Sequence, residues 1–300
     1  MNIANEGRPL AVELWHEARP RQWVKNVLVL AAPAAAGILG HARPLAQSLL
    51  AVLAFCAAAS GTYFINDLAD LEADRLHPTK RNRPIAAGSI PVGTATVVGL
   101  ALLALGVLLG LLTANPKTAL IIGLYVALTL GYTLWFKHIA VIDLVAVAGG
   151  FILRALAGAT AVDVPMSRWF VLCISFGSLF IVTGKRYAEL VELGEDAAAV
   201  RATLDTYDGP FLRLVLGMAC STTLLTYCLW AFERAALAHH SVPFFELSIV
   251  PVVTAVLRYL LVLESGKQGA APEEVFFRDR PLQTLGLIWV ALFIAGVYVG

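Results

Sequence analysis

Charged side chains are scarce in this sequence. Asp, Glu, Lys and Arg make up 14% of the 300 residues, whereas soluble domains carry about 25%. A soluble chain of this length needs a charged surface around its core, and this charge is too sparse to cover one. Because 59% of the residues are hydrophobic, disorder and collagen are excluded as well. The composition therefore indicates a polytopic membrane protein.

Cysteine is also rare, and the chain contains 4. All of them lie in apolar stretches, and no C-x-x-C pair occurs. The sequence therefore gives no sign of a disulfide scaffold or of a cysteine-bound metal. The residues are Cys56, Cys173, Cys220 and Cys228.

Long apolar runs with few charged residues fill most of the chain. A membrane-spanning helix needs about 20 mostly apolar residues, and nine runs approach or reach that length. We therefore predict an all-α fold with nine transmembrane helices. The runs cover about 26–40, 45–66, 92–113, 118–136, 139–161, 168–184, 211–232, 242–263 and 281–299.

The residues before the first run are more polar. We expect residues 1–25 to form a cytoplasmic segment, in which Leu10 to Trp23 makes a short interfacial helix anchored by Trp15 and Trp23. We expect residues 26–300 to form a single integral-membrane domain.

Basic residues are distributed unevenly between the loops. With the N-terminus in the cytoplasm and nine spans, most of the 22 Lys and Arg fall on the cytoplasmic side. This asymmetry predicts a multi-pass protein of the inner (plasma) membrane with a cytoplasmic N-terminus and an external C-terminus. Those placed outside are Arg43, Lys117, Arg168 and Arg234, and those within runs are Arg154 and Arg258.

Acidic residues gather directly after the second apolar run. Asp67, Asp70 and Asp74 are spaced three and then four residues apart, so a helix would present them on one face. Like charges at these spacings repel, which favours a bound cation. Mg²⁺ prefers one or two carboxylates together with water and phosphate oxygens. We predict that these aspartates are the catalytic metal ligands.

Phosphate-binding side chains accompany this acidic row. Asn66 lies beside Asp70 on the same helical face, and Lys80 and Arg83 follow as donors suited to phosphate. The alternatives are a solvated loop of mixed charge, or a transporter or scaffold in which this row tolerates neutral substitution.

The pattern N-D-x-x-D-x-x-x-D from Asn66 to Asp74 is followed by His77-Pro78-x-Lys80 and Arg83-Pro84-Ile85-Ala86-x-Gly88. It resembles the first aspartate-rich motif of the UbiA prenyltransferase superfamily. The resemblance implies a helical bundle with a central cavity open to the cytoplasm, and Mg²⁺ held by the aspartates against a diphosphate.

The family's second aspartate motif is expected four spans later, as in a protein built from two similar halves, here about 26–136 and 139–300. In this chain Lys185, Arg186 and Tyr187 lead that loop, and Glu189 and Glu192 stand where aspartates are usual. This departure favours a donor with additional phosphate groups over a simple prenyl diphosphate.

Two further strings resemble one branch of the superfamily. They are Arg19-Pro20-Arg21-Gln22-Trp23-Val24-Lys25-Asn26 and Arg201-x-x-Leu204-x-x-Tyr207. That branch transfers 5-phosphoribose from phosphoribosyl pyrophosphate (PRPP) to decaprenyl phosphate, releases diphosphate, and supplies precursors for cell-wall arabinogalactan. The alternative is an aromatic prenyltransferase that uses a prenyl diphosphate for quinone or haem synthesis.

The resemblance also implies roles for individual residues. Lys185, Arg186 and Tyr187 would contact PRPP, and Glu189 would contact a ribose hydroxyl or a metal-bound water. The acceptor phosphate would be bound by Gln22 and Lys25. We expect no nucleic-acid partner, and a homo-oligomer remains open.

Arg154 lies inside an apolar run, where a charge is costly and usually faces a cavity or a partner. We expect it to contact phosphate deep in the cavity. The alternative is a structural ion pair with an acid such as Asp143.

Overall fold

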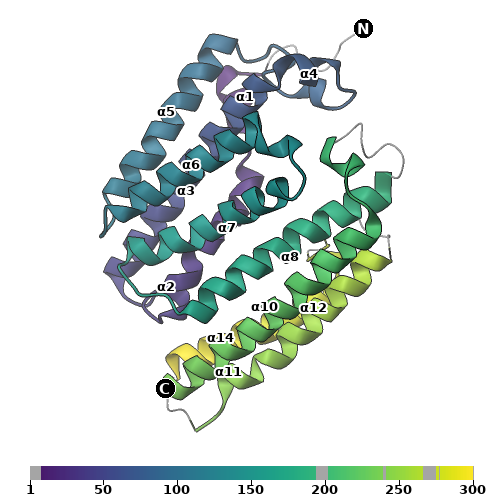
Figure 1. Cartoon of the computed structure of the whole chain (residues 1–300). Helices are drawn as coiled ribbons and strands as arrows, with labels where there is room; N and C mark the ends of the chain where they lie inside the picture. The colour runs from purple at the N-terminus through teal and green to yellow at the C-terminus, as the bar shows by residue number, and fades with distance from the viewer. Residues whose placement is uncertain (1–7, 194–201, 239–240, 266–274, 277, 300) are drawn as a thin grey trace. The chain divides into compact units, whose positions relative to one another are not determined.

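The computed structural model describes residues 8–193, 202–238, 241–265, 275–276 and 278–299, and within these ranges its regular elements are all helical (Figure 1). It contains 8 helices or helix pairs that are long and apolar enough to cross a membrane. They are α3 (Ala42–Ala69), α5 (Val92–Leu111), α6 (Lys117–Leu134), α7 (Ile142–Ala161), α8 (Arg168–Leu193), α10 (Gly209–Ala238), α11 (Phe244–Leu247) with α12 (Ile249–Glu264), and α14 (Arg280–Tyr298).

These helices correspond to the last eight of the predicted runs. The first predicted run, 26–40, is instead built from a 3₁₀ segment, η1 (Pro20–Leu30), and a short helix, α2 (Ala31–Ala35). Pro20 begins η1 and Pro33 lies inside α2. A proline inside a helix removes a backbone hydrogen bond, which limits a long regular helix here. The all-helical membrane fold is confirmed, and the ninth span stays a prediction.

A short helix, α1 (Leu10–Glu17), stands before η1, where the sequence predicted an interfacial helix. Its apolar side chains Leu10 and Trp15 are exposed, whereas Glu13 and Glu17 are buried. The rings of Trp15 and Trp23 meet edge to face with centroids 5.4 Å apart. This orientation presents apolar groups outward and turns the acids toward the protein.

The chain divides into two compact units. Unit 1 comprises residues 1–34, 38–136 and 153–164, and unit 2 comprises 35–37, 137–152 and 165–300. Unit 1 also contains α4 (Leu71–Leu76) and η2 (Lys80–Asn82), and unit 2 contains η3 (Phe136–His138) except for its first residue, and η5 (Ala202–Asp205).

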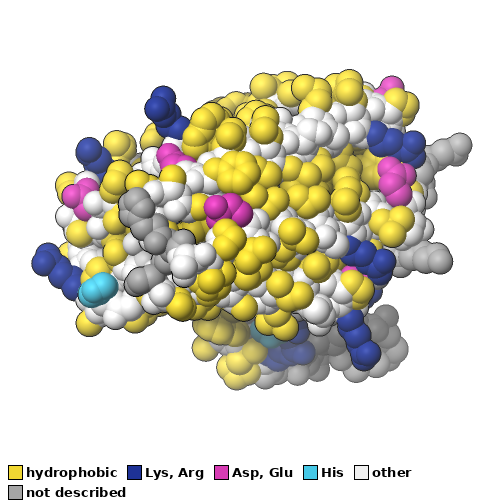
Figure 2. Space-filling model, turned by 90° about the horizontal axis from the view of Figure 1, so that it is seen from below, with side chains coloured by type: hydrophobic (Ala, Val, Ile, Leu, Met, Phe, Trp, Pro, Cys, Tyr) yellow, Lys and Arg dark blue, Asp and Glu magenta, His cyan; other side chains and the backbone are white. Residues whose placement is uncertain are grey.

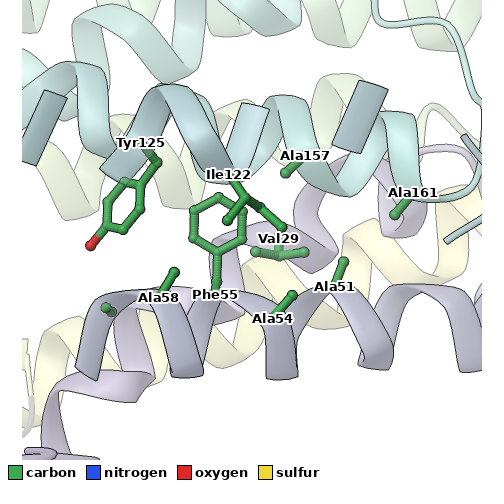
Figure 3. Close-up of a cluster of buried hydrophobic side chains, with 10 residues drawn as sticks. Val29, Ala51, Ala54, Phe55, Ala58, Ile122, Tyr125, Ala157 and Ala161 are labelled. Atoms are coloured by element: carbon green, nitrogen blue, oxygen red, sulfur yellow. The ribbon is translucent and has the colours of Figure 1, made fainter. Parts of the chain in front are cut away.

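Helix α3 forms the centre of unit 1 and packs against α5, α6 and η1. Figure 3 shows Phe55 of α3 facing Ile122 of α6 in a core completed by small side chains such as Ala58. Close approach needs small residues, because a Cβ at Gly106 of α5 would lie 2.8 Å from the carbonyl oxygen of Ala54. This packing fixes the position of α3, and the acidic motif begins at the C-terminal end of that helix.

In unit 2, α8 packs along α10 and α12 packs against α14. Phe180, Tyr259 and Leu263 belong to the core between these helices. Large apolar side chains such as Leu257 and Leu287 are exposed, and Figure 2 shows hydrophobic side chains spread across the face it presents. Extensive exposed apolar surface is expected where lipid replaces water as the solvent.

Candidate active site

The acidic motif lies where α3 ends. The sequence predicted one continuous helix through Asp74, but α3 ends at Ala69, Asp70 occupies the turn, and α4 begins at Leu71. Backbone hydrogen bonds from Asp70 to Asn66 and from Asp74 to Asp70 continue through the turn, with lengths of 2.9 and 2.8 Å. Asp67 and Asp74 are buried, whereas Asp70 is partly exposed.

Asn66 is beside Asp70, as the spacing predicted. Its Nδ2 lies 3.3 Å from Oδ1 of Asp67 and 3.4 Å from Oδ2 of Asp70. Its Oδ1 accepts a hydrogen bond of 2.9 Å from the Thr133 hydroxyl of α6. Asn66 therefore orients the two carboxylates, and Thr133 of α6 holds the side-chain amide of Asn66 in place.

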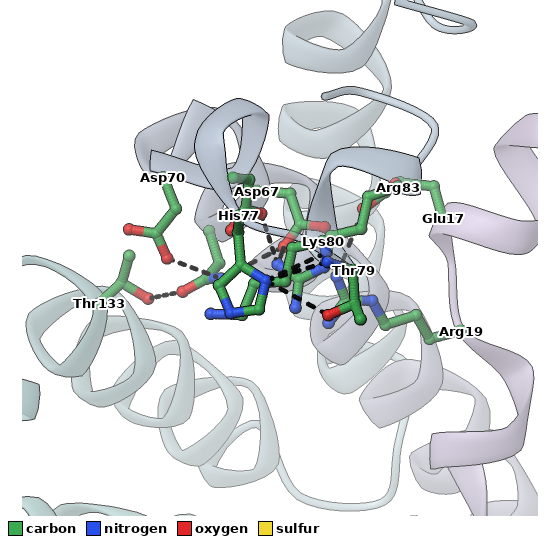
Figure 4. Close-up of polar contacts among 11 residues, drawn as sticks. Glu17, Arg19, Asp67, Asp70, His77, Thr79, Lys80, Arg83 and Thr133 are labelled. Carbon is green, nitrogen blue, oxygen red and sulfur yellow. Dashed lines mark hydrogen bonds and ion pairs between the residues drawn. The ribbon is translucent and has the colours of Figure 1, made fainter. Parts of the chain in front are cut away.

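Two arginines bind the carboxylates of this motif (Figure 4). Nη1 of Arg83 donates to Oδ1 of Asp67 at 3.1 Å and to Oδ2 of Asp74 at 2.6 Å. Arg19, from the turn between α1 and η1, donates to Oδ2 of Asp67. Arg83, which was predicted to bind phosphate, thus lies against the aspartates, and its role toward phosphate stays a prediction. Arg19 was not assigned a role from the sequence, although it belongs to the first string that resembles the phosphoribose-transferring branch.

Glu17 adds another buried carboxyl group to this cluster. Both of its side-chain oxygens are buried, and it lies beside Asp67 and within 3.8 Å of the Arg19 guanidinium. Burial, and secondarily the Asp67 charge, raise the pKa of Glu17 to about 8. Sequence reasoning missed this residue because the segment that carries it was interpreted only as an interfacial helix.

Other predicted residues of unit 1 lie on nearby elements. Lys80 is half-buried in η2, and its backbone N–H and that of Thr79 donate to Nδ1 of His77 at 3.3 and 3.2 Å. Gln22 and Lys25 lie together on η1, where Lys25 Nζ donates to the Gln22 side-chain oxygen at 2.6 Å.

Arg154 is buried within α7. Its Nε donates to Asn26 Oδ1 at 2.8 Å, its Nη2 donates to Tyr125 Oη at 3.0 Å, and its guanidinium lies 4.7 Å from the Tyr125 ring centroid. Asp143, its alternative partner in the sequence interpretation, accepts hydrogen bonds from Arg186 and Tyr207. Neutral polar groups and aromatic rings therefore contribute to holding this cation.

The second predicted segment lies on α8 in unit 2. Arg186 is buried, and it donates to Asp143 Oδ2 at 3.3 Å and to Glu189 Oε2 at 3.0 Å. Asp143 also accepts from the hydroxyls of Tyr207 and Thr203, at 2.5 and 3.3 Å. Asp143, Thr203 and Tyr207 were not assigned to the site from the sequence, although an acid at the start of an apolar run was a usable signal.

Tyr187 belongs to a different contact group. Its hydroxyl donates to Glu264 Oε2 at 3.1 Å and accepts from Arg213 Nε at 2.8 Å. Lys185 is half-buried and Glu192 is exposed. Arg201, part of the second of those strings, lies outside the described residues.

A magnesium ion is compatible with the cluster of unit 1. No group of three or more His, Cys, Asp or Glu side chains is arranged as a metal site among the described residues. Mg²⁺ needs only one or two protein carboxylates, because water and substrate phosphate complete its coordination. The two buried side-chain oxygens of Glu17, beside Asp67, are further potential oxygen ligands in this cluster. The residues therefore fit a divalent cation that arrives with a phosphate ligand.

Known proteins resemble the chain over nearly its whole length. It matches the UbiA prenyltransferase family over residues 27–278. It is similar to decaprenyl-phosphate phosphoribosyltransferase from Corynebacterium glutamicum, with 45% identity covering 94% of this chain and 85% of the relative. The enzyme of the same name from Mycobacterium tuberculosis is 43% identical, covering 94% of this chain and 93% of the relative.

A solved structure shows the same fold. A UbiA homologue from Archaeoglobus fulgidus bound to GPP and Mg²⁺ superposes with a TM-score of 0.70 at 20% identity, covering 96% of this chain and 98% of that chain.

Proposed function

Because the chain belongs to the UbiA prenyltransferase family, we propose that it transfers the 5-phosphoribosyl group of PRPP to decaprenyl phosphate and releases diphosphate. Relatives with this activity in their names are 45% and 43% identical and cover 94% of the chain. These full-length similarities favour this reaction over aromatic prenyl transfer. The product would feed the synthesis of cell-wall arabinogalactan.

One observation carries the chemistry: Asp67 and Asp74 are buried carboxylates joined through the guanidinium of Arg83 at the end of α3. Carboxylates suit Mg²⁺, and guanidinium groups suit phosphate. Asp67, Asp70 and Asp74 would hold Mg²⁺, directly or through water, and the ion would neutralise charge on the leaving diphosphate. Asn66, Lys80 and Arg83 would bind that diphosphate.

The acceptor already carries its nucleophile. A phosphate monoester is anionic at neutral pH, so no general base is required. Its oxygen forms a bond to C1 of the ribose while the bond from C1 to the diphosphate oxygen breaks, and the bonding electrons leave with the diphosphate. A single displacement of this kind inverts the configuration at C1, through an oxocarbenium-like transition state.

Residues that align the two substrates complete the proposal. Lys185, Arg186 and Tyr187 are assigned to PRPP and Glu189 to its ribose hydroxyls or a water. Gln22 and Lys25, already in contact on η1, are assigned to the acceptor phosphate. Arg154 is assigned to phosphate deeper in the protein. Alignment and charge stabilisation would then supply most of the catalysis.

The protein is an integral membrane protein, and we place its reaction at the cytoplasmic face of the plasma membrane. Lys and Arg favour cytoplasmic loops, and PRPP is a cytosolic metabolite. Nine spans would leave the C-terminus outside.

A transfer assay tests this function. Purified protein is given Mg²⁺, ribose-labelled PRPP and decaprenyl phosphate, and the expected result is label in the lipid fraction. Asp67→Asn should reduce the rate roughly 100-fold or more, whereas Glu72→Gln, at an exposed position paired with Arg75, should transfer normally. Absence of labelled lipid from the wild type, or normal transfer by Asp67→Asn, contradicts the proposal.

A further inference from the structure

Asp67 and Asp74, two of the three aspartates assigned to Mg²⁺, already have cationic partners. Arg19 and Arg83 occupy both side-chain oxygens of Asp67, and Arg83 also binds Asp74. A free Mg²⁺ ion entering here would meet carboxylates whose charge is already balanced by guanidinium groups. It would also have to separate charge-assisted hydrogen bonds, which are stronger than neutral ones.

The arginines are better placed to move than the carboxylates. The side chains of Arg19 and Arg83 are 27% and 28% exposed, whereas those of Asp67 and Asp74 are 1% and 4% exposed. The arginine side chains are therefore more accessible to an incoming phosphate than the carboxylates are. The carboxylates stay fixed within the cluster.

The backbone at Arg19 is held in an unusual conformation. Its φ of 52° lies in the left-handed region, which is unfavourable for a non-glycine residue. The turn is fastened to α3, because the Ser60 hydroxyl donates to the Ala18 carbonyl at 2.9 Å and accepts from Trp23 Nε1 at 3.1 Å. The Tyr63 ring lies 4.9 Å from the guanidinium. The base of the side chain is thus fixed, with its charged end at Asp67.

Arg83 is placed by its neighbour in the sequence. It has an extended conformation, with ψ of 144°, directly before Pro84, which disfavours a helical conformation for the preceding residue. This extended segment lets one guanidinium reach Asp67 on α3 and Asp74 on α4. Arg19 and Arg83 therefore come from separate segments and share one carboxylate.

We propose that Arg19 and Arg83 are resident counter-cations, which occupy the aspartates until Mg²⁺ arrives with a diphosphate and then transfer their hydrogen bonds to the diphosphate oxygens. This inference rests on the proposed function and deepens it. Free Mg²⁺ binds weakly, because the arginines would give up charge-assisted hydrogen bonds without gaining the diphosphate oxygens. The metal and the diphosphate therefore bind with positive coupling, for which a factor of roughly 5–150 is typical.

The proposal predicts opposite changes in two affinities, one for free metal and one for diphosphate. Arg19→Gln and Arg83→Gln remove a competing cation and a diphosphate donor together. Each variant should bind free metal roughly tenfold more tightly and bind diphosphate in the presence of Mg²⁺ roughly tenfold more weakly. A purely structural role for either arginine would weaken both affinities or leave both unchanged.

The experiment measures binding rather than turnover. Mn²⁺ replaces Mg²⁺ in titrations followed by electron paramagnetic resonance, and inorganic diphosphate with Mg²⁺ is titrated by calorimetry, both on purified full-length protein. Arg75→Gln is the matched control, because Arg75 lies on α4 but pairs with the exposed Glu72 at 2.8 Å. It should change neither affinity.

Arg19→Lys and Arg83→Lys are controls that separate the loss of positive charge from a general loss of structure in the glutamine variants. They keep the positive charge, so they should keep the weak free-metal affinity of the wild type. The inference is overturned if no glutamine variant gains metal affinity, or if the lysine variants gain as much as the glutamine variants. If the wild type transfers phosphoribose but the variants do not show these changes in affinity, this inference alone is overturned. If the wild type shows no transfer, the proposed function is overturned.

Discussion

Asp279 makes two stabilising contacts at the start of α14. Its carboxylate accepts a hydrogen bond of 3.0 Å from the Leu282 N–H, as an N-cap, and one of 2.8 Å from Nη2 of Arg258. The Arg258 hydrogen bond holds the pKa of Asp279 below its ordinary value of 3.8. A lowered pKa means that the ionised side chain stabilises the folded state above pH 3.8, and that this contribution is lost as the pH falls through the folded-state value.

We therefore expect Asp279→Ala to lower the free energy of unfolding by about 1–2 kcal/mol at pH 7. The difference from the wild type should shrink as the pH falls below 3.8, because the carboxyl group takes up a proton first in the unfolded state and finally in the folded state. Thermal unfolding in detergent at several pH values measures this. Asp279→Asn keeps a cap acceptor and should lose less. A difference that grows in acid would be inconsistent with this account.

The local spacing of residues predicted only part of the candidate site. Asp67, Asp70 and Asp74 lie close together in the sequence, so helical periodicity was enough to identify them. Other contacts join residues that are distant in sequence. Arg19 and Asp67 are 48 residues apart, and Tyr207 and Asp143 are 64 apart. No periodic pattern predicts such pairs, because tertiary packing creates them.

At the scale of elements, the hydroxyl of Tyr207 joins the segment after η5 to the start of α7. Val141 has φ of 69°, which is strained for a β-branched residue. Its N–H donates to Tyr207 Oη at 2.6 Å, and the same hydroxyl donates to Asp143 Oδ1 at 2.5 Å. Asp143 in turn holds Arg186 of α8. Burial and the bond to Asp143 raise the pKa of Tyr207, so its proton remains in place at neutral pH.

Tyr207→Phe should therefore affect both stability and the segment of α8 that we propose binds PRPP. Loss of a buried hydroxyl that serves two partners should cost about 1–3 kcal/mol. With Arg186 less well oriented, the Michaelis constant for PRPP should rise more than that for decaprenyl phosphate. Tyr298→Phe, at an exposed tyrosine, is the control. Equal increases in the two constants would argue against a role on the donor side.

Close helix contacts provide a second test at this scale. A Cβ on Gly158 of α7 would overlap the carbonyl oxygen of Val29 in η1, whereas a Cβ on Gly123 of α6 would have no neighbour within 4 Å. Gly158→Ala should destabilise the protein by about 1–3 kcal/mol through overpacking. Gly123→Ala should be neutral or slightly stabilising, since alanine favours helix. The melting temperatures of the two variants in detergent decide this, and equal values would contradict the packing of α7 on η1.

At the scale of the whole molecule, composition and run length predicted most of the fold. Eight of the nine predicted runs match long apolar helices, because the length that crosses a bilayer is a simple physical requirement. The first run differed because apolar composition does not distinguish an α-helix from the 3₁₀ segment that Pro20 begins. Its conformation depends on packing against α3, which a single run of sequence does not contain.

The membrane topology can be tested at α5, and this test does not depend on whether the first predicted run crosses the membrane. Arg75 precedes α5 and Lys117 follows it, and both side chains are exposed. A 20-residue helix rises about 30 Å, the thickness of the hydrocarbon core. In a variant without native cysteines, Lys117→Cys should therefore react with a membrane-impermeant maleimide in intact cells, whereas Arg75→Cys should react only after the cytoplasmic face is opened. Reaction of both from one side would mean that α5 does not cross the membrane. Reaction of Arg75→Cys alone in intact cells would place the aspartate cluster outside, away from cytosolic PRPP, and would contradict the proposed function.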